Sequence, residues 1–287
     1  MKKIGFIGVG IMGKSMVRNL MKHGFEVHLF ARNIEKVEDV IGEGANFHDT
    51  ISSLAKGKDA IITIVGYPHD VEEVYLEKGN ILDSANQGTY LMDMTTSSPM
   101  LAKKIHEKSA KRGLHFLDAP VTGGELGAKN GTLSIMVGGD KKDYQACLPV
   151  FEAMGENINY LGSAGAGQHC KLGNQILVAG ALSGVCEAFT YAKSKGLDLN
   201  EFMKAVSTGA GSSRQLEMLG QKMIDEDYNP GFYLHHMAKD LQLALIEANM
   251  SELNLEVLSQ ILANFQELEQ EGYGKLGTQA LMKYYQN

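Results

Sequence analysis

A glycine-rich turn near the start of the chain has residue types and a spacing that could hold a phosphate group. The turn consists of Gly8, Val9, Gly10, Ile11, Met12 and Gly13, in the pattern G-x-G-x-x-G. Alone the pattern is weak, because a chain with 33 glycines produces chance matches. Here an apolar run precedes it and a helical run follows, which is the context of a dinucleotide-binding loop. Such glycines permit a tight turn, backbone approach to a pyrophosphate and close helix packing. A strand–helix turn without a ligand is the alternative.

The end of the second expected strand bears on which dinucleotide is bound. Folds that bind NAD usually place Asp or Glu there, to accept hydrogen bonds from the ribose hydroxyls. Here the strand ends in Ala31, Arg32 and Asn33, and no carboxylate follows before Glu35. Arg32 and Asn33, with Lys36 one turn further on, could hold a 2′-phosphate instead. The pattern predicts a preference for NADP with NAD still possible, and the alternative is that Arg32 is a solvated loop residue.

A second glycine-rich segment has donors suited to a carboxylate. Thr122, Gly123 and Gly124 follow a strand that ends near Asp118. Consecutive backbone N–H groups in such a turn, together with a hydroxyl, form a neutral cradle for an anion. We therefore expect a glycine-rich turn that binds a substrate carboxylate, and a purely structural turn is the alternative.

Two further blocks combine charged and amide side chains inside helical runs. Lys171, Asn174 and Gln175 stand at positions i, i+3 and i+4, which share one helix face. An isolated helical lysine usually lies on the surface, so this spacing alone assigns Lys171 no role. Lys239 and Asp240 form a charged pair within an otherwise apolar helix.

The elements that must position these residues alternate in the first half of the chain. Strands are expected at 3–8, 26–31, 60–65, 90–94, 115–119, 132–137 and 158–161, and helices at 11–22, 99–111 and 140–154. Ser97 and Ser98 supply the cap of the second helix, and Pro99 its first residue. Such alternation predicts an α/β fold of the Rossmann type, with a doubly wound parallel sheet covered by helices on both faces.

After Gly162 the sequence changes to helices separated by Gly, Asn and Pro. The run 167–195 lacks proline and is rich in Ala and Leu, and as one helix it would extend roughly 43 Å. We therefore expect a dinucleotide-binding domain at 1–162 and an all-α domain at 163–287, joined by this long helix.

Composition narrows the functional class. The formal net charge of −7 makes a nucleic-acid surface improbable. The three cysteines have no paired or metal-type spacing, which fits a reducing cytoplasm. The nine histidines include no i, i+4 pair of the kind that would indicate a metal site. Glycines break the N-terminal apolar run before any cleavage site, and no uninterrupted apolar run reaches 18 residues, so we expect neither a signal peptide nor a membrane span.

Taken together, these blocks resemble the β-hydroxyacid dehydrogenase family, which includes 3-hydroxyisobutyrate dehydrogenase and semialdehyde reductases. The family's blocks occur in order along essentially the whole chain, at 5–13, 93–99, 118–124, 171–175 and 239–241. Several ordered blocks are far more specific than any one of them. They favour a catalytic role for Lys171 over a surface one.

The resemblance implies a role for each block. Lys171 would be the general acid or base, Asn174 would orient the substrate, and Thr122, Gly123 and Gly124 would hold its carboxylate. Val65, Thr96 and Lys239 would line the cofactor site, while Asp240 would lie at the substrate site and support Lys171. The sequence departs from the common pattern at three positions: Thr122 replaces a serine, Gln175 a second asparagine, and Ser15 a proline. Gln175 would also lie at the substrate site, with a role that this replacement leaves less defined.

The expected activity is the NAD(P)-dependent interconversion of a small 3-hydroxy or 4-hydroxy acid and its semialdehyde, without a metal. Imine reductases share the architecture but usually lack the lysine. A phosphosugar-acid dehydrogenase would require more basic residues than the C-terminal tail offers. A non-catalytic dinucleotide sensor would not need Lys171, Asn174 and Thr122 together. Apolar helices in the second half favour a homodimer or homotetramer.

Overall fold

The structure, a computed structural model, describes residues 1–286 and divides into two units, Met1–Lys171 and the remainder from Leu172 onward. A sheet of nine strands forms the centre of the first unit. The strands are β1 (Lys3–Ile7), β2 (Glu26–Phe30), β3 (Asn46–Phe47), β4 (Ala60–Thr63), β5 (Tyr90–Asp93), β6 (His115–Asp118), β7 (Val121–Thr122), β8 (Leu133–Gly139) and β9 (Gly155–Gly162).

The order of the strands is that of a doubly wound Rossmann sheet. Along the sheet they run β3-β2-β1-β4-β5-β6-β8-β7, with β9 beside β8. The strands from β3 to β6 in this order are all parallel, whereas β8 runs antiparallel to β6 and β7. The order reverses between β1 and β4, and ligands of such sheets bind at the carboxyl ends of the strands beside this point.

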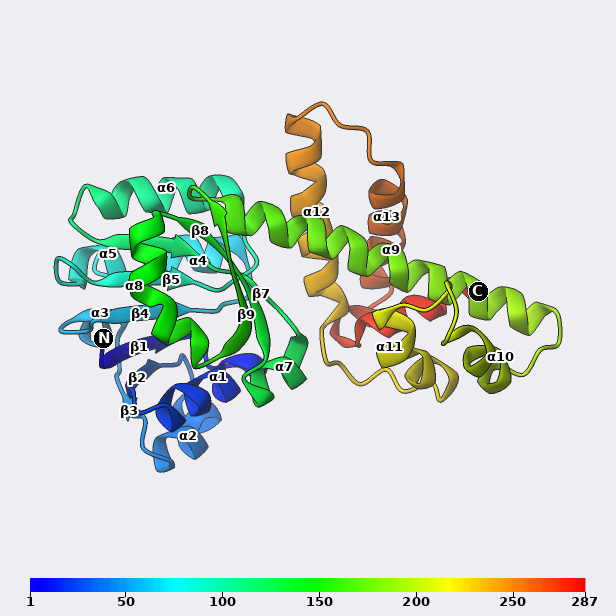
Figure 1. The fold of residues 1–287 in the computed structure, drawn as a ribbon, viewed down its shortest axis with the longest axis horizontal. Helices are drawn as coiled ribbons and strands as arrows, with labels where there is room; N and C mark the ends of the chain where they lie inside the picture. The colour runs from blue at the N-terminus through cyan, green and yellow to red at the C-terminus, as the bar shows by residue number, and fades with distance from the viewer. Residues whose placement is uncertain (287) are drawn as a thin grey trace. The chain divides into compact units, whose positions relative to one another are not determined.

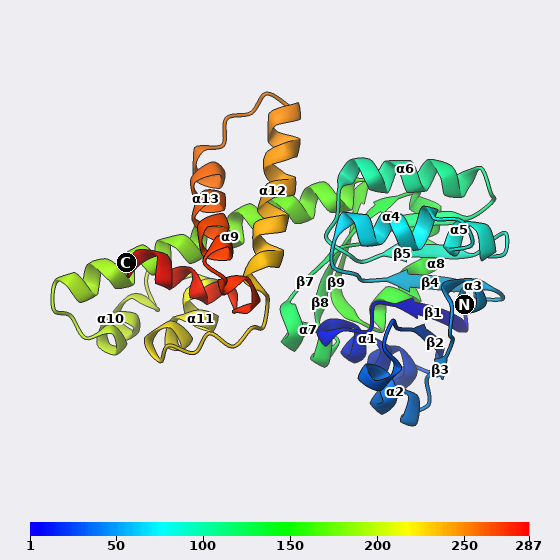
Figure 2. The same cartoon turned by 180° about the vertical axis from the view of Figure 1, so that it is seen from behind.

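Helices cover both faces of this sheet, because successive strand residues point to opposite sides. Ile62, Met92 and Leu117 join one apolar core, and their neighbours Ile61 and Leu91 join the other. Figure 1 shows α8 in front of the sheet, and Figure 2 shows α4 and α5 on the opposite face. The first core is completed by α1 (Ile11–Lys22), α2 (Glu38–Gly42) and α8 (Lys141–Glu152), and the second by α3 (Ile51–Ala55), α4 (Pro68–Leu76), α5 (Ile81–Ser84) and α6 (Pro99–Ala110).

The segment after Thr122 differs from the glycine-rich turn that we expected. Gly123 and Gly124 do form a turn with positive φ, but α7 (Gly124–Asn130) starts at once. This helix ends at Gly131, whose left-handed φ of 70° is typical of a helix end. Between these glycines lie Glu, Leu, Ala and Lys, which are good helix formers. Because glycine is typical of turns, the glycines at both ends of this segment make its sequence resemble a turn and not a helix.

The second unit is helical, as expected. It contains most of α9 (Ala166–Ser194), together with α10 (Leu199–Val206), α11 (Arg214–Ile224), α12 (Leu234–Met250), α13 (Glu256–Gln270) and the 3-10 turns η2 (Tyr273–Lys275) and η3 (Thr278–Tyr285). One apolar core joins these helices, and Leu182 and Phe189 contribute to it from α9.

Helix α9 has the length and apolar composition of a membrane span, although only by those two criteria. Its most apolar window of 18 residues has a mean hydropathy of 1.2, and 44% of that window is buried inside the protein. Core helices of soluble proteins have the same properties, so this is weak evidence. Several of its side chains, such as Leu182, are buried in the apolar core of the second unit.

Candidate active site

The loop after β1 has a glycine at each position where a side chain would interfere. Gly8 has a φ of +99°, and a β-carbon on it would overlap the carbonyl oxygen of Ile64. A β-carbon on Gly13 would overlap the carbonyl oxygen of Gly8. Gly10 is different, since it caps α1, is exposed, and no neighbouring atom lies within 4 Å of a β-carbon built there. The space above Gly10 at the helix N-terminus therefore fits a pyrophosphate.

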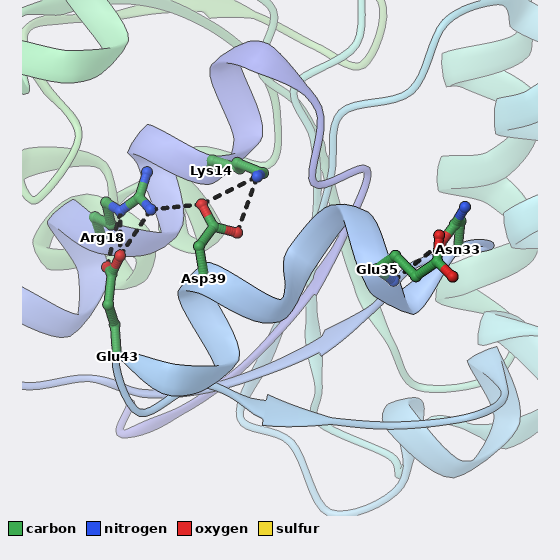
Figure 3. Close-up of polar contacts among 6 residues, drawn as sticks. All are labelled: Lys14, Arg18, Asn33, Glu35, Asp39 and Glu43. Carbon is green, nitrogen blue, oxygen red and sulfur yellow. Dashed lines mark hydrogen bonds and ion pairs between the residues drawn. The ribbon is translucent and has the colours of Figure 1, made fainter.

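Ion pairs hold α1 against α2, which follows the second strand (Figure 3). Arg18 binds Glu43 and Asp39, with shortest distances of 2.7 and 2.8 Å, and Lys14 lies 2.9 Å from Asp39. Hydrogen bonds from Lys14 and Arg18 lower the pKa of Asp39 to about 2. Single exposed pairs contribute little, but a network of this kind restricts where α2 can lie relative to the glycine loop.

The residues expected to select the dinucleotide lie together after β2. The Arg32 side chain is 84% exposed, and its nearest ion-pair partner, Asp70, is 3.9 Å away. Asn33 accepts a hydrogen bond from the backbone N–H of Glu35 at 2.9 Å, so its oxygen caps the 3-10 turn η1 (Ile34–Val37) (Figure 3). Lys36 is exposed within this turn. The side chains of Arg32 and Lys36 are thus two exposed cations near the end of β2.

A hollow of about 460 Å³ lies beside this strand end. It is lined by Phe30, Ala31, Arg32, Ile34, Phe47 and Asp49. Asp49 is a carboxylate that the dinucleotide-binding pattern does not indicate, because it lies beyond the end of the second strand. It follows β3, a strand of two residues that no periodicity could reveal. Both an arginine and a carboxylate therefore border the hollow.

The loops after β4 and β5 are joined by a buried polar network. Thr63 donates a hydrogen bond of 2.8 Å to Asp93 and is bonded to the hydroxyl of Tyr75 at 2.9 Å. The backbone N–H of Val65 donates to the hydroxyl of Thr95 at 3.0 Å. Burial raises the pKa of Asp93 to about 6, against the lowering effect of hydrogen bonds from Thr95 and Thr63. This network holds the loop segments that carry Val65 and Thr96 at the carboxyl edge of the sheet.

A second buried network ties the start of α9 to the same edge. Asp118, at the end of β6, accepts hydrogen bonds from the backbone N–H groups of Gly165 and Gln168 at 2.7 and 2.9 Å. The side-chain amide of Gln168 donates to the carbonyl oxygen of Thr95 at 2.7 Å and accepts from the N–H of Ser97 at 2.8 Å. Burial raises the pKa of Asp118, although these backbone donors oppose the effect.

Lys171 follows Gln168 by three residues and is buried, with 7% of its surface exposed. It belongs to the same unit as the glycine loop and as Thr122, which pairs with Ser134 in β8. Gly123 and Gly124, the other expected carboxylate donors, are exposed at the start of α7. The first unit therefore holds Lys171 and both glycine-rich loops.

The remaining expected site residues form a chain of contacts within the second unit. Asn174 donates to the side-chain oxygen of Gln175 at 2.8 Å, and Gln175 donates to Oδ2 of Asp240 at 2.7 Å. The other oxygen of Asp240 lies 3.0 Å from Nζ of Lys239. The carboxylate of Asp240, which the resemblance assigns to supporting Lys171, is thus engaged by Gln175 and Lys239. Asp240 is therefore the hydrogen-bond partner of Gln175, and the sequence alone did not identify it.

Gln168 is the other residue that sequence reasoning missed. It stands three positions before Lys171 on the same helix, and this spacing could have revealed it. Within residues 1–286, no group of three His, Cys, Asp or Glu side chains is arranged to hold a metal ion.

Comparison with known proteins covers both units. Residues 3–162 match the family described as the NAD binding domain of 6-phosphogluconate dehydrogenase. Residues 165–285 match the family described as NAD-binding of NADP-dependent 3-hydroxyisobutyrate dehydrogenase. The two matches meet at residues 162–165, close to the domain boundary expected from the sequence, whereas the compact units divide after Lys171, inside α9.

Similar proteins match over most of their length. An uncharacterized oxidoreductase of Bacillus subtilis, YkwC, is 46% identical, and the match covers 99% of each chain. The 2-hydroxy-3-oxopropionate reductase of Escherichia coli is 40% identical over 88% of this chain and 86% of its own. Among solved structures, a 3-hydroxyisobutyrate dehydrogenase from Salmonella typhimurium superimposes with a TM-score of 0.91 at 26% identity, covering 99% of both chains.

Proposed function

The chain belongs to the β-hydroxyacid dehydrogenase family, and from this premise we propose that it interconverts a short 3-hydroxy or 4-hydroxy carboxylate and the matching semialdehyde. Membership makes the protein an oxidoreductase with a nicotinamide dinucleotide as cofactor. The open space above Gly10, between Gly8 and Gly13 that tolerate no side chain, supports binding of that cofactor at the loop after β1.

The observation that carries the proposed mechanism is the placement of Lys171. Its side chain is buried near the start of α9, where Asp118 and Gln168 anchor the helix to the carboxyl edge of the sheet. When bound, the dinucleotide supplies a nicotinamide ring that exchanges hydride with the substrate carbon. In oxidation the amine of Lys171 takes the proton of the hydroxyl group as the carbonyl forms. In reduction the ammonium returns that proton to the carbonyl oxygen.

The proposed carboxylate site consists of the Thr122 hydroxyl and the N–H groups of Gly123 and Gly124. The names of two relatives describe short carboxylates that carry oxygen at carbon 3, namely 3-hydroxyisobutyrate and 2-hydroxy-3-oxopropionate. Arginines that could anchor a substrate phosphate are scarce. Of the four in the sequence, Arg18, Arg112 and Arg214 are already paired with acidic side chains. This favours a simple carboxylate over a phosphorylated sugar acid.

We further propose that NADP is preferred over NAD, with Arg32 and Lys36 facing the 2′-phosphate. The two exposed cations after β2 support this preference. The carboxylate of Asp49, which lines the same hollow as Arg32, acts against it, because a carboxylate repels a phosphate group. The preference is therefore expected to be moderate rather than absolute.

A spectrophotometric panel tests the proposed function. Short 3-hydroxy and 4-hydroxy acids and their semialdehydes are each assayed with both dinucleotides, and methyl esters of the same acids are the matched controls. We expect turnover of at least one acid, with a much higher KM for its methyl ester. The ester lacks the negative charge of the carboxylate, to which Thr122, Gly123 and Gly124 are proposed to donate hydrogen bonds. Equal kcat/KM for acid and ester would contradict the proposed carboxylate site. Turnover of cyclic imines in place of the acids would replace the proposed activity with imine reduction.

A further inference from the structure

Gln168 makes two side-chain hydrogen bonds in a place where no water can reach it. Its exposed fraction is 0%. The amide nitrogen donates to the carbonyl oxygen of Thr95 at 2.7 Å, and the amide oxygen accepts from the N–H of Ser97 at 2.8 Å. Thr95 and Ser97 flank Thr96 in the loop after β5. One side chain therefore fixes both sides of this loop to the first turns of α9.

The helix start has little freedom to move around this contact. Asp118 binds the backbone N–H groups of Gly165 and Gln168. At Gly138 an added β-carbon would lie 2.7 Å from Oδ1 of Asp118, and at Gly167 it would lie 2.7 Å from the Asp118 carbonyl oxygen. Backbone and carboxylate are packed too closely for any side chain at these two glycines. A shift of the helix start would thus break several buried contacts at once.

Lys171 lies less than one helical turn beyond Gln168, on the same face of α9. Helix geometry separates the two residues by about 4.5 Å along the axis. We propose that Gln168 is a positioning residue, which sets the location of the Lys171 amine relative to the loop after β5. This inference rests on the proposed role of Lys171 as proton donor and acceptor. It explains why a polar side chain occupies a fully buried position, where an unpaired amide would be costly.

Substitution of Gln168 gives the first readout. Gln168→Leu preserves approximate volume and removes both hydrogen bonds. We expect kcat to fall about 100-fold, the order that a misplacement of about 1 Å can cost, with little change in the Kd of the dinucleotide. The matched control is Gln279→Leu, because Gln279 is equally buried in the second unit and donates to the carbonyl oxygens of Asp227 and Asn229. That control is expected to lower Tm while kcat stays near wild type.

Gln168→Glu separates positioning from general destabilisation. A protonated glutamic acid can donate to Thr95 and accept from Ser97 as the glutamine does, whereas the ionised form has no donor and faces the Thr95 carbonyl oxygen. The kcat of this variant relative to wild type should therefore fall as pH rises. Burial raises the pKa of a carboxyl group, which brings the change into a measurable range. A ratio that is constant with pH would overturn the proposal, even if Gln168→Leu failed to fold.

The Lys171→Ala variant distinguishes failure of the positioning role of Gln168 from failure of the proposed function. If Lys171→Ala loses activity and Gln168→Leu keeps a near-normal kcat, Gln168 has no positioning role and the proposed function stands. If Lys171→Ala itself keeps a near-normal kcat, the proposed function fails and the positioning role fails with it. If both single variants are impaired, we expect the double variant to be no slower than Lys171→Ala. A further loss in the double variant would show that Gln168 does not act through Lys171.

Discussion

Gln175 and Asp240 are joined by a hydrogen bond of 2.7 Å from the amide nitrogen to Oδ2. Both side chains are buried, with exposed fractions of 3% and 1%. The second oxygen of Asp240 lies 3.0 Å from Nζ of Lys239. A buried carboxylate that binds one ammonium and one amide is stable only while both partners remain, since a lone buried charge is costly.

Removing that carboxylate should destabilise the protein. Asp240→Leu removes the ion pair with Lys239 and the hydrogen bond from Gln175, and loss of one member of a buried pair costs about 3 kcal/mol or more. Asp240→Asn should cost less, because its amide oxygen still accepts from Gln175. Urea unfolding measures the free energy of unfolding of both variants. Glu217→Gln is the control, since its pair with Arg214 is exposed and 3.5 Å long. Equal stabilities of the Leu and Asn variants would contradict this account.

Arg32→Asp should reverse the preference for NADP. The substitution removes the cation that we propose faces the 2′-phosphate, and it adds an acceptor for the ribose hydroxyls. Hydrogen bonds to charged groups contribute about 1.5–3 kcal/mol, so the ratio of kcat/KM for the two cofactors should change about tenfold to a hundredfold. Asp49→Asn is the counterpart and should raise the preference for NADP. An unchanged ratio in Arg32→Asp would exclude Arg32 as the discriminating residue.

Because of Asp93, the free energy of unfolding should decrease as pH rises from about 4 to about 6. Burial raises the pKa of Asp93 from 3.8 to about 6, so the folded state binds its proton more tightly than the unfolded state does. This contribution is fully present below the unfolded pKa and is lost as pH rises through the folded pKa. A shift of about two units corresponds to about 3 kcal/mol.

The difference between wild type and Asp93→Asn isolates this effect. Free energies of unfolding from urea titrations at several pH values should converge or cross as pH rises, with the variant gaining relative stability. Asp39→Asn is the control of opposite sign, because the pKa of Asp39 is lowered to about 2 and its contribution is lost as pH falls. Parallel profiles for wild type and Asp93→Asn would contradict the assignment.

We propose that the chain forms a closed dimer or tetramer through apolar side chains on its helical unit. Leu177 and Tyr191 are 76% and 64% exposed, and they lie on one face of α9 about four turns apart. Exposed apolar surface of this kind usually marks an interface. Light scattering should give two or four times the chain mass of 31.2 kDa. Leu177→Lys should lower that mass, and a wild-type monomer at micromolar concentration would refute the proposal.

The Rossmann sheet could be predicted from sequence because its central strands are continuous apolar runs between clear helices. Strands β3 and β7 could not, since two residues carry no periodicity. The position of Asp49 after β3 could not be predicted for the same reason. The sequence of helix α7 resembles a turn because glycines enclose it.

The tight turn at Gly8, Gly10 and Gly13 could be predicted because its motif has a fixed spacing. Partners could not be predicted where they depend on tertiary contacts. The bond between Gln175 and Asp240 joins residues 65 positions apart, and that between Gln168 and Thr95 joins residues 73 positions apart. Nothing in either local sequence specifies the other residue.

The central claim is that Lys171 transfers the proton, and kcat of two variants tests it most directly. Proton transfer by a positioned side chain contributes about 10²–10⁴-fold, so Lys171→Ala should lower kcat by that order while the Kd of the dinucleotide changes little. Lys171→Arg should be nearly as inactive, because a guanidinium keeps its proton and cannot act as the base. If Lys171 only attracted the substrate carboxylate by its charge, arginine would restore much of the activity, and alanine would raise KM rather than lower kcat. A Lys171→Arg enzyme with near-normal kcat would contradict the mechanism.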